Sequence, residues 1–360
     1  MVLREPPMSL HDERKRIDII DGEIIRLLNE RALCAQAAAR EKAKLGLPVY
    51  DPTREQVVVD RILASNQGPL RGDTMALLYR EVISACRALE HELRVAYLGP
   101  EGSFTHLACH EHFGHAITTI PAATIPDVFI EVEKDAADYG LVPIENSTEG
   151  VESHTLDMFV NSTVQMCAET NLEITQNLLG KCALAEVRTV YSHPNALGQC
   201  QSWLRTHLPL ATTVPVSSTS RGAELASRED AASAIGNLLA GRLYGLNVLA
   251  ARIEDNPNNR TRFLVIGKVQ NPPTGKDKTS LVFSLVHRPG ALFDALENLK
   301  KHEINMSMIQ SRPNRLQPWE YFFFVDCFGH QQEAKVMAAL DGLRPHCHLL
   351  RVLGSYPEGE

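Results

Sequence analysis

Three basic residues near the start of the chain have a spacing that could bind an anionic ligand. Arg31 and Lys42 are 11 residues apart, which on an α-helix is about 20° from three full turns, so both side chains would lie on one face. Arg14 comes 17 residues before Arg31, about 25 Å away along a helix axis, too far for both to contact one small ligand. If all three serve one site, Arg14 must come from a second copy of the chain; otherwise they are ordinary solvated helix charges.

Polar side chains also follow short apolar runs in the middle of the chain. The segment 97–105 reads YLGPEGSFT, a glycine-containing turn before a helix, which is typical of an anion-binding helix N-terminus. The segment 142–147 reads VPIENS and places a carboxylate, an amide and a hydroxyl after another apolar run. Similar polar groups occur at 192–194, 218–220 and 261–263. Each group alone is equally well explained as a capped turn.

Residues 1–92 must position the N-terminal cations, and their pattern is helical throughout. No glycine or proline occurs between Glu23 and Leu45, which predicts one unusually long helix with apolar residues at helical spacing. Asp51 followed by Pro52 begins a second helix, and a third begins near residue 73. Because three helices of such unequal length close a core poorly, we expect the chain to form a homodimer or a higher homo-oligomer.

From residue 95 onward, short apolar runs alternate with helical stretches, which is typical of α/β proteins. The segment 268–278, rich in proline and charge, predicts a linker. The residues after it predict the order β-α-β-β-α-β of an α+β ferredoxin-like sandwich, with strands near 279–286, 304–311, 320–328 and 348–353 and helices near 290–301 and 331–343. The expected domains are 1–92, 94–270 and 278–356.

Composition limits the possible partners and the cellular compartment. The net charge of −8 argues against a nucleic-acid partner, since a phosphate backbone selects basic surfaces, so acidic substrates would need local basic pockets. The eight cysteines form no C-x-x-C pair, and neither a signal peptide nor a membrane-spanning run occurs, which indicates the cytoplasm. His106 and His110 have metal-ligand spacing without a further ligand motif, so we expect no metal and no cofactor.

The charged residues of the N-terminal segment follow the pattern Arg14…Asp21…Glu30-Arg31…Lys42…Asp51-Pro52-Thr53-Arg54-Glu55. This pattern resembles the all-helical chorismate mutases that begin bacterial P-proteins, which implies three helices per chain in an intertwined dimer. The resemblance implies catalytic roles for Arg14 of the partner subunit, Arg31, Lys42, Asp51, Arg54, Glu55 and Glu90, and substrate contact by Cys86. Where the family often has serine and glutamine, this chain has Cys86 and Glu90.

The implied reaction suits these residue types. Chorismate is a dicarboxylate whose rearrangement to prephenate is pericyclic, so the site must hold the substrate's arm over its ring and needs no covalent step. Arginine forks suit the carboxylates, and a lysine suits the ether oxygen on which negative charge grows. Glu90 could donate a hydrogen bond to that oxygen only when it is protonated.

The central segment contains the motifs G-P-x-G-S-F, V-P-I-E-N, S-H-P…Q-C, S-T-S, Y-G-L and T-R-F. Together they resemble prephenate dehydratases over residues 94–268, which implies a two-lobed periplasmic-binding-protein-like fold with the site in its cleft. Prephenate loses its ring hydroxyl and carbon dioxide to give phenylpyruvate, so the protein mainly needs to protonate the leaving hydroxyl. The resemblance places Thr261 beside that hydroxyl and implies positioning roles for Glu145, Asn146, Ser192, Gln199, Ser218 and Phe263. Arg262 is either a carboxylate clamp or a structural ion-pair partner.

Two further motifs occur near the C-terminus, RPGAL at 288–292 and QSRP at 310–313. They resemble the two ligand motifs of the ACT domain that ends prephenate dehydratases. The resemblance implies that phenylalanine binds at a dimer interface beside Gly290, Ala291, Leu292, Ser311, Arg312 and Pro313. The alternative is an ACT-like domain that serves only to dimerise.

We therefore expect a bifunctional enzyme of L-phenylalanine biosynthesis, which rearranges chorismate to prephenate, converts prephenate to phenylpyruvate and is inhibited allosterically by phenylalanine through its ACT domain. One alternative is a monofunctional prephenate dehydratase whose helical domain is a non-catalytic dimerisation module. A second is a non-catalytic regulator with a binding-protein-like core and an ACT sensor, which would need a DNA-binding helix-turn-helix where this chain has the N-terminal cations.

Overall fold

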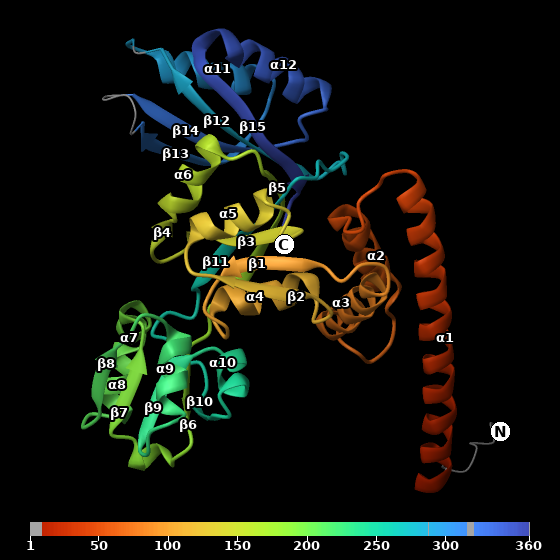
Figure 1. Ribbon diagram of the computed structural model, residues 1–360, viewed down its shortest axis with the longest axis vertical. Coiled ribbons are helices and arrows are strands. Elements are labelled where there is room, and N and C mark those ends of the chain that lie inside the picture. The colour runs from red at the N-terminus through yellow and green to blue at the C-terminus, as the bar shows by residue number, and fades with distance from the viewer. Residues whose placement is uncertain (1–8, 287, 315–319, 360) are drawn as a thin grey trace, which may run out of the picture.

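The structure is a computed structural model that describes residues 9–286, 288–314 and 320–359. Figure 1 shows three parts: helices at the N-terminus, two α/β lobes in the middle, and a sheet covered by two helices at the C-terminus. No helix in these described ranges is long and apolar enough to cross a membrane.

Three helices form the N-terminal part: α1 (Leu10–Lys44), α2 (Pro52–Ser65) and α3 (Gly72–Ala88). Helix α1 begins after Ser9, whose Oγ accepts a hydrogen bond from the backbone N–H of Asp12 at 3.2 Å. The predicted long helix runs through Gly22, because one glycine costs only about 1 kcal/mol of helix stability, which the surrounding helix formers outweigh. The second helix begins at Pro52 after the Asp51 cap, as predicted.

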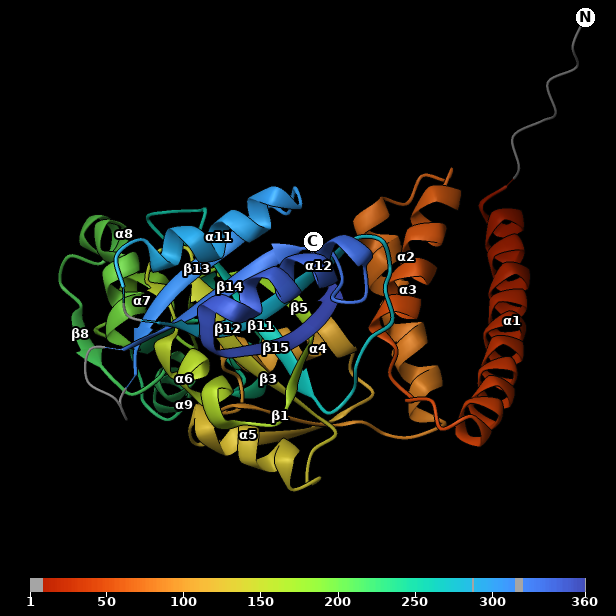
Figure 2. The ribbon, with the colours of Figure 1, turned by 90° about the horizontal axis from the view of Figure 1, so that it is seen from above.

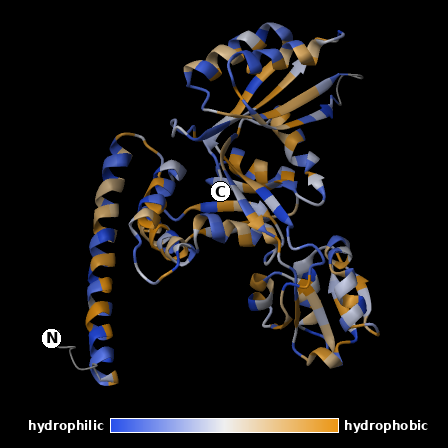
Figure 3. Cartoon of the chain, turned by 180° about the vertical axis from the view of Figure 1, so that it is seen from behind, coloured by the Kyte–Doolittle hydropathy of each residue, from blue (hydrophilic) through white to orange (hydrophobic). Residues whose placement is uncertain are grey.

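Helix α1 is left largely uncovered by its own chain. It lies beside α2 and α3 in both Figures 1 and 2, and none of its residues is buried. Figure 3 shows hydrophobic residues along its length. Five apolar side chains at helical spacing are between 40% and 55% exposed: Ile17, Ile20, Ile24, Leu27 and Leu28.

The first lobe is a mixed sheet in the order β2-β1-β3-β11-β5, with the short β4 paired to β3. Strand β1 is parallel to β2 and β3, whereas β11 is antiparallel to β3 and β5. Its elements are β1 (Arg94–Leu98), α4 (Phe104–Phe113), β2 (Thr118–Ala122), α5 (Ile125–Glu133), β3 (Tyr139–Asn146), β4 (Gly150–Val151), α6 (Ser153–Asn161), β5 (Gln165–Glu173) and β11 (Arg260–Gly267).

The second lobe is a smaller sheet in the order β10-β6-β9-β7-β8. Its elements are β6 (Asn177–Gly180), β7 (Thr189–Ser192), α7 (Pro194–Gln199), α8 (Gln201–His207), β8 (Thr212–Pro215), α9 (Thr219–Ala226), β9 (Ala232–Gly236), α10 (Leu238–Leu243) and β10 (Asn247–Ala250). The chain crosses between the lobes twice, at 174–176 and at 251–259. The predicted two-lobed α/β architecture is thereby confirmed.

The C-terminal part is an antiparallel sheet in the order β13-β14-β12-β15. Its elements are β12 (Asp277–Leu285), α11 (Ala291–Lys301), β13 (Met306–Pro313), β14 (Tyr321–Phe328), α12 (Ala334–Leu343) and β15 (Cys347–Pro357). This element order confirms the predicted ferredoxin-like sandwich. The two helices cover one face, while Val282, Phe324 and Leu353 on the other face share a core with the first lobe.

The segment expected to be a linker, 268–278, is held firmly between these two parts. The side-chain Nδ2 of Asn271 donates to the backbone oxygens of Cys167 at 2.6 Å and Ser355 at 3.1 Å. Strand β12 already begins at Asp277. The C-terminal sheet is therefore fixed against the first lobe by both apolar and polar contacts.

Candidate active sites

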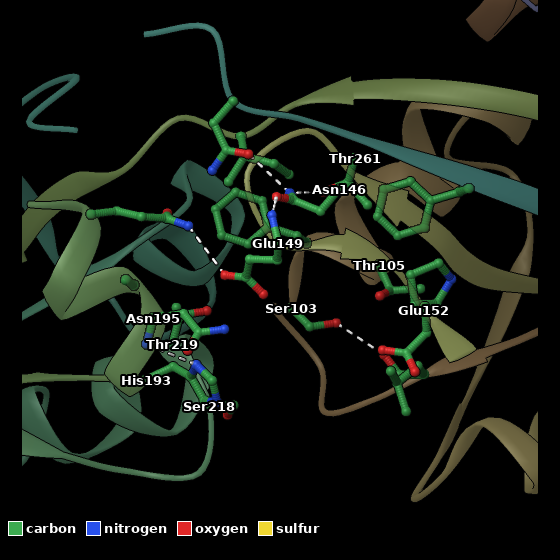
Figure 4. A pocket seen from close by; sticks show the side chains of 18 of the residues that line it. Ser103, Thr105, Asn146, Glu149, Glu152, His193, Asn195, Ser218, Thr219 and Thr261 are labelled. Atoms are coloured by element: carbon green, nitrogen blue, oxygen red, sulfur yellow. Dashed lines mark hydrogen bonds between the residues drawn. The ribbon is translucent and has the colours of Figure 1, made fainter. Parts of the chain in front are cut away.

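A cleft of about 410 Å³ lies between the two α/β lobes. It is lined by the turn between β1 and α4, the ends of β3 and β11, and the N-terminal ends of α7 and α9, as Figure 4 shows. Six of the eight residues expected at the dehydratase site line it: Glu145, Asn146, Gln199, Ser218, Thr261 and Phe263.

The hydroxyl of Thr261 is oriented by a network of amides. Thr261 and Asn146 are direct partners in the antiparallel pairing of β11 with β3. The Nδ2 of Asn146 donates to Thr261 Oγ1 at 2.8 Å and to Asn259 Oδ1 at 2.9 Å, while its Oδ1 accepts from the backbone N–H of Thr148 at 2.9 Å. Because Thr261 Oγ1 accepts a hydrogen bond from Asn146, its own proton is available for donation into the cleft.

The two other expected residues do not line the cleft. Ser192 is fully buried and its Oγ donates to the backbone oxygen of Ile235 at 2.8 Å. Arg262 points away because successive side chains of a strand face opposite sides of a sheet. Its Nη1 lies 2.7 Å from Asp326 Oδ2 and its Nε donates to Glu169 Oε2 at 2.7 Å. Of the two roles left open for Arg262, the structure supports the ion pair.

Among the described residues that line the cleft, none is a lysine or an arginine. The positive ends of two helices are present instead: α4, capped by Ser103, and α9, capped by Ser218. The first backbone N–H groups of a helix have no partner within it and attract anions. The local basic pocket expected for an acidic substrate is therefore replaced by helix N-termini from both lobes.

Several lining residues were not identified from the sequence. Figure 4 shows Glu149 between Asn146 and the second-lobe residues His193 and Ser218, and Glu149 Oε1 accepts from Gln199 Nε2 at 3.3 Å. This bond joins the two lobes across the cleft. Other lining residues of this kind are Glu152, Asn195 and Asn259, whereas Ser103, Thr105 and Thr219 belong to the segments 97–105 and 218–220 that the sequence had indicated. Asn259 could have been identified from the sequence, because it precedes Thr261 by only two residues and its side chain would face the same side of a strand.

A second constellation surrounds the C-terminal end of α3. The Nζ of Lys42 donates to the backbone oxygen of Val49 at 3.3 Å, and the carboxylate of Glu55 pairs with Arg87 at 2.6 Å. Burial raises the pKa of Glu55, against the opposing effects of Arg87 and Lys42. Burial likewise raises the pKa of Glu90, against those of Lys42 and Arg87. Lys42 and Arg87 are thus each within electrostatic reach of both Glu55 and Glu90. Arg87 was not identified from the sequence.

The other residues expected at the mutase site do not all join the group formed by Lys42, Glu55 and Glu90. Asp51 caps α2 by accepting from the backbone N–H of Arg54 at 2.9 Å, and the side chain of Arg54 is exposed. Cys86 is buried. Arg14 and Arg31 lie on the same unbroken helix α1, so the described chain does not bring them together.

The two C-terminal ligand motifs occupy different places within one chain. Gly290, which has a φ of +76°, precedes α11, and Ala291 and Leu292 line a pocket of about 180 Å³. Ser311, Arg312 and Pro313 lie on the edge strand β13, and Arg312 forms a bidentate ion pair with Asp157 on α6 at 3.1 and 3.0 Å. The second motif is therefore tied to the first α/β lobe.

The histidines on α4 contact one another. His106 Nδ1 accepts from the backbone N–H of Gly102 at 3.0 Å, and His106 Nε2 lies 3.1 Å from His110 Nε2. Burial lowers the pKa of His106 to about 4. Within residues 9–286, 288–314 and 320–359, no group of three or more His, Cys, Asp or Glu side chains is placed so that it could hold a metal ion.

Three family models match the chain in succession. They are chorismate mutase type II at residues 13–91, prephenate dehydratase at 95–271 and the ACT domain at 279–345. A bifunctional chorismate mutase/prephenate dehydratase from Aquifex aeolicus is 46% identical over 355 residues, which cover 97% of this chain and 98% of that protein. The corresponding protein of Neisseria gonorrhoeae is 44% identical over 348 residues and 96% of each chain.

The structure is also similar to a solved one. The prephenate dehydratase of Arthrobacter aurescens in complex with L-Phe matches with a TM-score of 0.69 and 36% sequence identity. The match covers 74% of this chain and 90% of that one.

Proposed function

The chain belongs to the bifunctional chorismate mutase/prephenate dehydratases, and we propose that it divides their two reactions between the constellation at the end of α3 and the cleft between the lobes. The helical part rearranges chorismate to prephenate. The cleft converts prephenate to phenylpyruvate, water and carbon dioxide. The observation that carries the second assignment is the Thr261 hydroxyl, held by Asn146 at 2.8 Å in a cleft that both lobes line.

The cleft suits a dianion whose ring loses a hydroxyl and a carboxylate together. The N-terminal N–H groups of α4 and α9 hold the carboxylates without forming the tight ion pair that a guanidinium would make. Thr261 donates to the departing hydroxyl as the bond between ring carbon and oxygen breaks, and the electrons of the carbon–carboxylate bond complete the aromatic ring. Because threonine is a weak acid, its proton must be replaced through a relay, for which Glu145 lines the same cleft.

The helical part suits a pericyclic reaction of a dicarboxylate. Lys42 and a protonated Glu90 stabilise the ether oxygen, while Glu55 and Arg31 position the substrate. The apolar stripe of α1 is exposed in a single chain, and a helix with such a stripe needs a partner to cover it. We assign that role to α1 of a second copy, which also brings Arg14 of the partner subunit to the site.

The C-terminal sandwich is the regulatory part. The Arthrobacter aurescens dehydratase binds L-Phe, and we assign the same ligand to Gly290, Ala291 and Leu292 of one chain with the exposed edge strand β13 of another. Edge strands carry unpaired backbone groups that favour pairing between copies. Arg312 on β13 contacts Asp157 on α6, and Glu152 directly before α6 lines the cleft. Phenylalanine bound beside β13 can therefore act on the dehydratase site through one helix.

Assays of both reactions on one purified preparation test whether the helical part and the cleft catalyse different reactions. The purified chain should consume chorismate and form phenylpyruvate from added prephenate, and L-phenylalanine should slow the second reaction. Lys42→Ala should lower the mutase kcat/KM by roughly 100-fold, the cost of removing one charge-stabilising group, and should leave the dehydratase unchanged. A wild-type chain that forms phenylpyruvate but does not consume chorismate would mean that the helical domain serves only to dimerise.

The mutase should become slower as pH rises, and Glu90 should be the cause. Burial raises the pKa of Glu90 in the folded protein. Only the protonated form donates to the ether oxygen, so activity is present below this raised pKa and is lost as pH rises through it. Measured from pH 5 to 9, the mutase kcat/KM of Glu90→Gln should decline less than that of the wild type. Superimposable profiles would exclude Glu90 as the donor, since both proteins retain Lys42 and Glu55.

A further inference from the structure

Arg87 is a buried arginine that no sequence motif identified. It lies in the last turn of α3 and only 5% of its side chain is exposed. Its Nη1 donates to Glu55 Oε1 at 2.6 Å, and its Nη2 donates to the backbone oxygen of Phe113 at 2.5 Å. The guanidinium carbon also lies 5.3 Å from the centre of the Tyr50 ring. Both ends of the guanidinium fork are therefore fixed.

The two hydrogen-bond partners of Arg87 belong to different parts of the molecule. Glu55 is on α2 of the helical part, whereas Phe113 is the last residue of α4 in the first lobe. The last carbonyl groups of a helix lack partners within it and attract cations. The junction is closely packed: Tyr50 is part of the core of the first lobe, and its hydroxyl lies 2.6 Å from His112 Nε2. The dehydratase lobe thus fixes the guanidinium that holds Glu55.

We propose that Arg87 is a positioning residue of the mutase site, through which the first dehydratase lobe holds the carboxylate of Glu55 in place. This inference rests on the proposed role of Glu55 at that site. It gives the helical domain a reason to be fused to the dehydratase, because the anchor for one of its substrate-positioning groups lies outside it. A purely structural clamp would join the two parts equally well, but its loss would not selectively change the mutase rate or the pH dependence of that rate.

The charged groups around Glu55 predict how the pKa of Glu55 changes when Arg87 is removed, and this change can be measured. Burial raises the pKa of Glu55, Arg87 lowers it most among the charged neighbours, Lys42 lowers it less, and Asp51 raises it. The pocket that Glu55 shares with α3, α4, β5 and the C-terminal segment also contains Arg80, Glu111, His112, Glu169 and Glu358. Arg87 lowers the pKa of Glu90 as well. Removing Arg87 should therefore raise the pKa of both carboxyls.

The experiment compares Arg87→Gln and Arg87→Lys in the full-length chain. Arg87→Gln should lower the mutase kcat/KM by roughly 10- to 100-fold, the usual effect of losing a hydrogen bond to a charged group. It should also move the pH dependence of the mutase to higher pH, because Arg87 lowers the pKa of both Glu55 and Glu90. Arg87→Lys keeps the charge and should recover part of the rate. Dehydratase kcat/KM should change by less than about twofold, because the cleft is at the opposite end of α4, about 15 Å away.

Two further variants separate the possible failures. Arg94→Gln removes a guanidinium from the neighbouring pair with Asp138 and should leave the mutase unchanged. If Glu55→Gln impairs the mutase while Arg87→Gln keeps the wild-type rate and pH profile, Arg87 does not position Glu55. If both Arg87 variants lose the two activities in parallel, Arg87 is only a clamp and the inference is overturned. If Glu55→Gln is fully active, the proposed role of Glu55 is itself wrong.

Discussion

Replacing Thr261 by valine should lower the dehydratase kcat by roughly 10²- to 10⁴-fold, the range expected for loss of a proton-transfer group. Valine keeps the branched shape that β11 accommodates and removes only the hydroxyl. Asn146 retains Asn259 as a hydrogen-bond partner at 2.9 Å, so the network loses one member without collapsing. Chorismate consumption should stay within about twofold of the wild type, because the mutase constellation lies at the other end of the first lobe, and prephenate should accumulate.

Thr261→Ser is the matched variant for this prediction. It restores the hydroxyl without the methyl group and should recover most of the dehydratase rate, whereas a variant impaired only by altered packing would not recover. Simultaneous assays of chorismate loss and phenylpyruvate formation make the comparison. Equal loss of both activities in a folded Thr261→Val chain would contradict the division of the two reactions between the helices and the cleft.

Local patterns were sufficient to predict the helical N-terminal part and the C-terminal sandwich, whereas the two lobes of the middle part were implied by the resemblance to prephenate dehydratases. The alternating apolar residues of the C-terminal segment fixed each strand and helix of the sandwich to within a few residues, because each element follows from its own periodicity. The same holds for α1, in which no proline interrupts the helical pattern. Asn146 and Thr261 stood out as polar residues beside apolar runs, but their roles came from the resemblance to prephenate dehydratases; Asn146 ends β3, whereas Thr261 lies at the start of β11 rather than after a strand.

The residues that were not identified from the sequence make contacts with residues far away along the chain. Asn259 contacts Asn146 across 113 positions of the chain, and Glu149 reaches Gln199 across a cleft that exists only once two lobes have folded. Arg262 adjoins Thr261 in sequence, yet the alternation of β11 turns it toward Glu169 and Asp326. No local pattern encodes which side of a sheet a neighbouring domain will cover. Arg87 shows the same limit, because its partner carbonyl belongs to a different domain.

Mixing two inactive mutase variants should restore activity if the site is shared between chains. Arg14 and Arg31 lie 17 residues apart on one unbroken helix, about 25 Å along its axis, and cannot meet within one chain. Arg14→Ala and Arg31→Ala should each be nearly inactive. After subunit exchange, about half of the dimers are mixed and each contains one intact site, so about a quarter of the wild-type rate should return.

The chain offers a matched control for this complementation. Arg31 and Lys42 lie on one face of the same helix, so a mixture of Arg31→Ala and Lys42→Ala chains contains no intact site in any dimer and should stay inactive. Exchange can be verified by native mass spectrometry of chains that carry different tags. Recovery in the Arg14 and Arg31 mixture but not in the control would require Arg14 to act on its partner's site. With exchange verified, no recovery in either mixture would mean that each chain builds its mutase site without its partner. The exposed apolar stripe of α1 would then not serve to bring Arg14 to a shared site.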